Sequence, residues 1–91
     1  MLFRSHYKLY LHSKLVNYNQ FICAVAIGNQ ESHWNWRATN GNHYGIFQMN
    51  NKKVKYMNPY QQIDWWLRYI KTRYDNKPCK ALSHLKNRNW H

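Results

Sequence analysis

The chain has 91 residues, of which 44% are hydrophobic and 18% aromatic, and its 14 Lys and Arg against 3 acids give a net charge of +11. This length supports one compact domain, and the apolar content is sufficient for a core, which excludes an intrinsically disordered chain. No stretch of the sequence approaches the ~20 apolar residues that a membrane-spanning helix needs. The basic excess favours a polyanionic partner such as nucleic acid or an anionic cell-wall polymer. A general abundance of Asn and Lys is an equally good explanation of it.

The first third of the chain contains one readable element. Residues 1–18 are basic and aromatic and follow neither a helical nor a strand period, so they are predicted to form an N-terminal arm or a short helix. Residues 19–32 have an apolar helical pattern, and we expect Gly28 to have a packing reason there, because glycine weakens a helix by ~1 kcal/mol relative to alanine. Residues 21–27 are similar to the apolar core of a signal peptide. Cleavage after Ala26 would remove most of the helix, so we interpret this run as a buried helix and not as a signal.

The rest of the chain predicts a small hairpin followed by two helices. The sequence Asn-Gly-Asn at residues 40–42 is typical of a tight turn and predicts a hairpin or an irregular β excursion. Asn58 is a predicted N-cap, with Pro59 at the first helical position and Gln61 completing a capping box. Apolar residues then recur every three or four positions, and Pro78 begins a last short helix. The predicted fold class is α+β and mostly helical.

The two cysteines, Cys23 and Cys79, leave two interpretations open. A disulfide between them would close a loop of 79 − 23 = 56 residues, and such a loop would stabilise the fold by ~4 kcal/mol in the chain-entropy treatment. The alternative is a pair of buried free thiols. The sequence contains no Cys-x-x-Cys, and its six His residues have no metal-ligand spacing. We therefore expect neither zinc nor another cofactor.

Three short motifs indicate a family. They are Glu31-Ser32 near a helix end, Ala38-x-Asn40, and the run from Tyr44 to Met49 that contains Gly-Ile-Phe-Gln. In this order and spacing the motifs resemble the lysozyme-like superfamily, and within it the soluble lytic transglycosylases, the resuscitation-promoting factors and phage cell-wall-degrading domains. The resemblance extends over roughly residues 20 to 91. It implies a minimal lysozyme-like fold over residues 19–91, with a small β-hairpin beside the catalytic helix.

The same resemblance implies an activity and a set of site residues. Members of the family cut the β-1,4 bond between N-acetylmuramic acid and N-acetylglucosamine in peptidoglycan. Glu31 would protonate the leaving glycosidic oxygen and then act as base. Gln48 matches a family glutamine that hydrogen-bonds substrate, Asn40 occupies a position where transglycosylases often carry serine, and Tyr44 lies beside the expected cleft. Trp34 is expected in the core and not against a sugar.

A lytic transglycosylase uses no second carboxylate, because the muramyl 6-hydroxyl attacks within the sugar and gives a 1,6-anhydro product. The two-carboxylate pattern of most glycosidases therefore does not apply. This sequence is compatible with that chemistry, since Asp64 lies early in a predicted helix and Asp75 in a predicted turn. Soluble transglycosylases also carry a tyrosine that hydrogen-bonds the catalytic acid. That motif has no counterpart here, and Tyr69 and Tyr74 are the candidates for its role.

The sequence thus predicts a peptidoglycan-cleaving enzyme, most simply a lytic transglycosylase, with a lysozyme-type hydrolase as a second outcome. The alternative is a non-catalytic cell-wall-binding or virion structural protein of the same fold, which the missing tyrosine motif favours. A nucleic-acid binder is a third hypothesis that no motif supports, so we expect no nucleic-acid partner. The expected partners are glycan strands of peptidoglycan and, for a phage particle, other virion proteins. The expected location is extracellular or virion-associated, at the bacterial wall.

Overall fold

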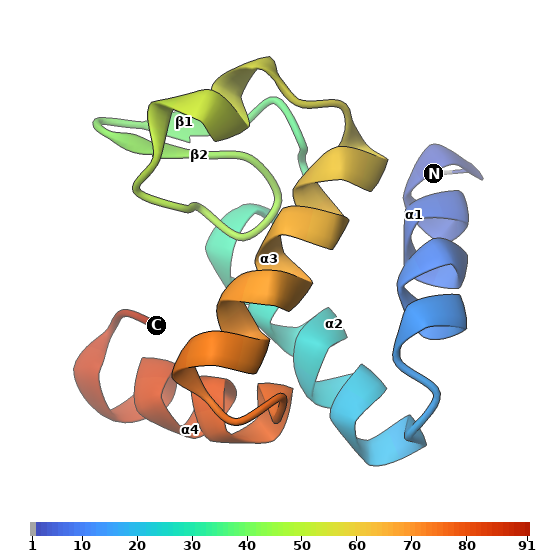
Figure 1. Cartoon of the computed structure of the whole chain (residues 1–91). Coiled ribbons are helices and arrows are strands. Elements are labelled where there is room, and N and C mark those ends of the chain that lie inside the picture. Colours follow the sequence, from blue (N-terminus) through green and yellow to red (C-terminus); the bar gives the residue numbers. More distant parts are fainter. Residues whose placement is uncertain (1) are drawn as a thin grey trace.

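A computed structural model describes residues 2–91, and Figure 1 shows a short hairpin at one edge of a group of helices. The elements in chain order are α1 (Leu2–Lys14), α2 (Tyr18–Ser32), β1 (Thr39–Asn40), β2 (His43–Tyr44), the 3-10 helix η1 (Lys52–Tyr56), α3 (Pro59–Arg73) and α4 (Pro78–Arg88). The two strands pair antiparallel, with Thr39 opposite Tyr44 and Asn40 opposite His43. This arrangement confirms the predicted α+β, mostly helical fold class with a small hairpin.

The N-terminal segment is a helix that packs against α2 and α3. Leu11 and Leu15, which lie one turn apart, are buried in the core. The Tyr10 hydroxyl donates to both carboxylate oxygens of Asp64 on α3, at 2.8 and 2.9 Å. Residues 2–14 are therefore a helix and not an extended arm. Met1, which belongs to the predicted 1–18 segment, lies outside the described residues.

The contact between Tyr10 and Asp64 makes stability depend on pH. The hydrogen bond to Asp64, then burial, then the negative charge of Asp64 raise the pKa of Tyr10 above its ordinary value. The contact therefore stabilises the fold fully below the unfolded-state pKa of ~10, and its contribution is lost as the pH rises through the higher folded-state pKa.

Tyr10→Phe is expected to lower the free energy of unfolding by ~1 kcal/mol at neutral pH, because one hydrogen bond is removed. Urea unfolding of both proteins at neutral pH and at about pH 11 measures the effect, and the wild type should lose more stability over that interval. Parallel losses in the two proteins would contradict the expectation.

Gly28 lies where the chain after α2 folds back onto the helix. A Cβ atom at Gly28 would be 2.5 Å from Nε1 of Trp34, which is closer than atoms can approach without a shift. That indole nitrogen donates to the Val25 carbonyl at 3.0 Å, and Trp34 is 1% exposed. The expected packing reason for Gly28 and the core position of Trp34 are both confirmed.

Helix α3 forms the centre of the fold and begins as predicted. The Asn58 side chain accepts from the Gln61 backbone N–H, the Gln61 side chain accepts from the Asn58 N–H, and Pro59 occupies the first turn. In the core, the ring of Trp66 on α3 stacks on Phe47 with centroids 4.0 Å apart. Within the described part of the chain, no helix is both long and apolar enough to cross a lipid bilayer.

A disulfide joins α2 to α4. It links Cys23 to Cys79 across a sequence separation of 56, so the free-thiol alternative does not apply. The two helices also pack against each other, and the Cys79 N–H donates to the Gln20 side chain at 2.9 Å. These contacts fix α4 against α2, and the last residues of the chain turn back from α4 into the fold (Figure 1).

Candidate active site

A pocket of about 500 Å³ lies between the end of α2, the hairpin with its following turn, and the last residues of the chain. The residues that line it are Glu31, Asn40, His43, Gln48, Met49, Asn50, Tyr69, Asn89, Trp90 and His91. Three of the four predicted site residues, Glu31, Asn40 and Gln48, are therefore brought together. Tyr44 lies outside this set, and its ring centroid is 5.9 Å from the Lys55 ammonium.

Glu31 is positioned by the end of α2. It lies in the last turn of the helix. The two residues that follow the helix, His33 and Trp34, have positive φ angles of 54° and 62°, which end the helix and reverse the chain. The Ser32 hydroxyl donates to the Ile46 carbonyl at 2.6 Å, which fastens the helix end to the turn after the hairpin. The Glu31 side chain is 20% exposed, so its carboxyl is partly shielded but reaches the pocket.

Gln48 organises the wall of the pocket that faces Glu31. Its amide nitrogen donates to the carbonyls of Gly45 and Ala38, at 2.8 and 3.2 Å, and its amide oxygen accepts from the Asn40 side chain at 2.9 Å. Its backbone φ of 51° is unusual for a residue other than glycine. Strained backbone of this kind concentrates at functional sites. The amide nitrogen of Gln48 thus holds the turn, and its amide oxygen positions Asn40 in the pocket.

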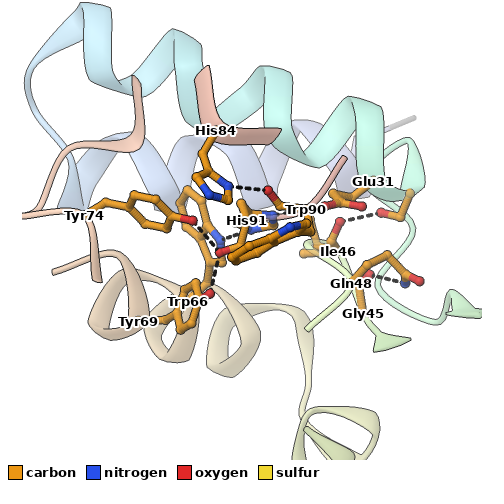
Figure 2. Close-up of polar contacts among 11 residues, drawn as sticks. Glu31, Gly45, Ile46, Gln48, Trp66, Tyr69, Tyr74, His84, Trp90 and His91 are labelled. Carbon is orange, nitrogen blue, oxygen red and sulfur yellow. Dashed lines mark hydrogen bonds and ion pairs between the residues drawn. The ribbon is translucent and has the colours of Figure 1, made fainter. Parts of the chain in front are cut away.

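His91 is the residue in contact with Glu31. The His91 Nδ1 atom lies 3.0 Å from the Glu31 Oε2 atom, and its Nε2 atom lies 2.9 Å from the indole nitrogen of Trp66 (Figure 2). The backbone carbonyl of His91 accepts from the hydroxyls of Tyr69 and of Tyr74, the latter at 2.7 Å. Burial raises the pKa of Tyr69 above its ordinary value, so its hydroxyl remains a donor around neutral pH.

Tyr69 and Tyr74, the two tyrosines considered as partners of Glu31, are therefore connected to it only through His91. In the described part of the chain, both hydroxyls are directed to the His91 carbonyl, and the His91 ring makes the contact with the acid. Sequence reasoning did not find His91. It lies 60 residues from Glu31, and no motif or periodicity connects the two positions.

The other two acids of the sequence lie elsewhere. Asp64 accepts from Tyr10 between α1 and α3, and Asp75 is an exposed residue with a φ of 56° in the turn after α3. Over residues 2–91, Glu31 is the single acid that lines the pocket. The same residues contain no group of three or more His, Cys, Asp or Glu that could hold a metal ion. Among the carboxyl side chains of residues 2–91, Glu31 alone is thus available to this pocket, beside the imidazoles of His43 and His91 and the hydroxyl of Tyr69.

A scan against protein-family models found no match to this chain, and searches of curated proteins and of solved structures found none either.

Proposed function

We propose that the chain is a peptidoglycan-cleaving enzyme with a minimal lysozyme-like fold, in which Glu31 is the general acid and base at the β-1,4 bond between N-acetylmuramic acid and N-acetylglucosamine. The main support is that a partly shielded carboxyl, Glu31, lines the same pocket as Asn40 and Gln48. At about 500 Å³ this pocket falls within the ~300–1,000 Å³ range of ligand sites.

The geometry around Glu31 suits a proton donor. Its Oε2 atom is occupied by His91 at 3.0 Å, which leaves Oε1 to carry the proton that is transferred. In the proposed reaction, this proton moves to the glycosidic oxygen as the bond to the muramyl C1 atom breaks. A positioned general acid typically contributes a factor of ~10²–10⁴ to the rate.

The presence of one carboxyl in the pocket favours an internal nucleophile. The muramyl 6-hydroxyl oxygen forms the new bond to C1, and its proton returns to the Glu31 carboxylate, so the acid is regenerated and no water is consumed. A two-carboxylate hydrolase needs a second acid either as nucleophile or to activate water. Asp64 and Asp75 lie outside the residues that line the pocket.

The charge of the chain supports action at the bacterial wall, from the extracellular side or from a phage particle. A net charge of +11 attracts a polymer that carries negative charges.

In this proposal Asn40 is the principal polar contact with the sugar, because Gln48 holds its amide at 2.9 Å and so fixes its orientation.

The product of the reaction distinguishes the proposed mechanism from its alternatives. Digestion of purified peptidoglycan is expected to give 1,6-anhydromuramyl ends, which lack one water of mass relative to hydrolysed ends. Mass spectrometry of the released muropeptides measures this difference directly. Products with reducing ends alone would show a lysozyme-type hydrolase, and binding without cleavage would show a wall-binding protein.

A further inference from the structure

We propose that His91 is a positioning residue for Glu31 and that Trp66 selects the tautomer in which His91 faces the carboxyl group. This inference rests on the proposed function, because it assigns the residue that orients the acid. It starts from a continuous chain of hydrogen bonds that runs from α3 through the last residue to α2 (Figure 2).

The direction of these hydrogen bonds follows from the chemistry of the indole ring. The Nε1 atom of Trp66 can only donate, so the His91 Nε2 atom, 2.9 Å away, must accept and carries no proton. A neutral imidazole then carries its one proton on Nδ1. The His91 Nδ1–H therefore donates to the Glu31 Oε2 atom over 3.0 Å.

The His91 ring is held in place from several sides. Its side chain is 3% exposed, and its carbonyl accepts from the hydroxyls of Tyr69 and Tyr74. The preceding carbonyl, that of Trp90, lies 2.8 Å from the His84 Nδ1 atom, which must donate because a carbonyl can only accept. Each backbone carbonyl of the last two residues thus has a side-chain donor from α3 or α4. These contacts hold the backbone of the last two residues, and the ring itself cannot turn away from Glu31 without breaking the hydrogen bond between its Nε2 atom and Trp66.

A neutral hydrogen-bond donor at Oε2 suits Glu31 to a reaction in which it must both release and take up a proton. It stabilises the carboxylate that forms when Glu31 releases its proton, since a hydrogen bond to the charged form favours that form. The titratable groups around the ring are Glu31 on α2, Tyr69 on α3, Tyr74 directly after α3, and His84 on α4. The Arg73 guanidinium lies beside the rings of Tyr74 and Trp90.

The tautomer can be tested without any activity measurement. Nitrogen-15 NMR of the imidazole rings is expected to show His91 protonated on Nδ1 in the wild type. In Trp66→Phe, which keeps an aromatic ring in the stack but removes the N–H, the Nε2–H form should appear. Trp65→Phe is the matched control, because it makes the same change at the neighbouring position and leaves the contact of Trp66 with His91 intact. A wild-type ring protonated on Nε2 would overturn the proposal.

The positioning role is tested with His91→Phe, which removes the donor and keeps a ring of similar size. The rate of peptidoglycan cleavage is expected to fall roughly tenfold or more, as for loss of one charge-assisted hydrogen bond. The pH profile of kcat should also change, because Glu31 loses the donor that faces its Oε2 atom. A lower rate with an unchanged pH profile, or an unchanged rate, would overturn the role of His91.

The two proposals fail in different ways. If the wild type cleaves peptidoglycan but His91→Phe leaves the pH profile in place, the positioning role is wrong and the proposed function stands. If the wild type cleaves no peptidoglycan, the proposed function is wrong and the positioning role of His91 is wrong with it. If His91→Phe does not fold, Trp66→Phe supplies the same test, since loss of tautomer selection should also change the pH profile.

Discussion

Glu31→Gln is expected to lower the rate of peptidoglycan cleavage by ~10²–10⁴-fold while leaving the fold unchanged. The substituted amide has nearly the same shape, and its oxygen can still accept from the His91 Nδ1–H that lies 3.0 Å from the acid in the wild type. It cannot transfer a proton to the glycosidic oxygen. The rate of release of soluble muropeptides measures the effect, and circular dichroism checks the fold.

The same acid-to-amide change at the other two acids provides matched controls. Asp75→Asn lies in an exposed turn and should leave the rate unchanged. Asp64→Asn should alter stability through Tyr10 and leave the rate near that of the wild type. Near-full activity of Glu31→Gln would contradict the assignment of the acid. An equal loss in Asp64→Asn would instead indicate a two-carboxylate hydrolase.

Removal of the disulfide is expected to have the largest effect on stability. The bridge between Cys23 and Cys79 spans 56 residues. Its loss should lower the free energy of unfolding by ~2–4 kcal/mol, because the unfolded chain gains freedom. For a domain of this size, that corresponds to a fall in Tm of roughly 10–30 °C.

Thermal unfolding with and without a reductant measures this effect. The double variant Cys23→Ser with Cys79→Ser is the control, since its Tm should be low and insensitive to the reductant. A wild-type Tm that does not respond to the reductant, together with two titratable thiols in denaturant, would contradict the bridge.

The helices with strong local signals could be predicted from the sequence, and α1 could not. Asn58, Pro59 and Gln61 form the predicted capping box because their contacts lie within one turn, so the sequence contains the whole of that information. Helix α1 has no regular apolar face, since exposed Leu9 lies among its apolar positions. Its buried face, which includes Leu11, is defined by packing on α2 and α3 and not by a clear period.

The candidate site also has one part that could be predicted from the sequence and one part that could not. Glu31, Asn40 and Gln48 come from one continuous stretch of sequence and could be identified by order and spacing. His91 could not, because the contact that matters depends on how α4 returns the chain to α2. The buried Gln62 on α3 is a similar case. Its side chain accepts from the Ile46 N–H at 2.9 Å and holds the turn after the hairpin, although its position in the sequence suggests only a polar helical residue.

In a chain that refolds with its disulfide reduced, the contact between Glu31 and His91 has a kinetic consequence, because it closes a loop of sixty residues. The chain entropy lost in closing so long a loop is offset only when α2, α3 and α4 have all packed together. Single helices form in about a microsecond, long before such assembly. A chain with its helices formed and α4 undocked would have Glu31 without its neighbour. During refolding, the acid–base geometry of this pocket therefore arises among the last events. Recovery of the pocket's chemistry would report complete assembly of the fold, whereas far-ultraviolet circular dichroism reports only the formation of the helices.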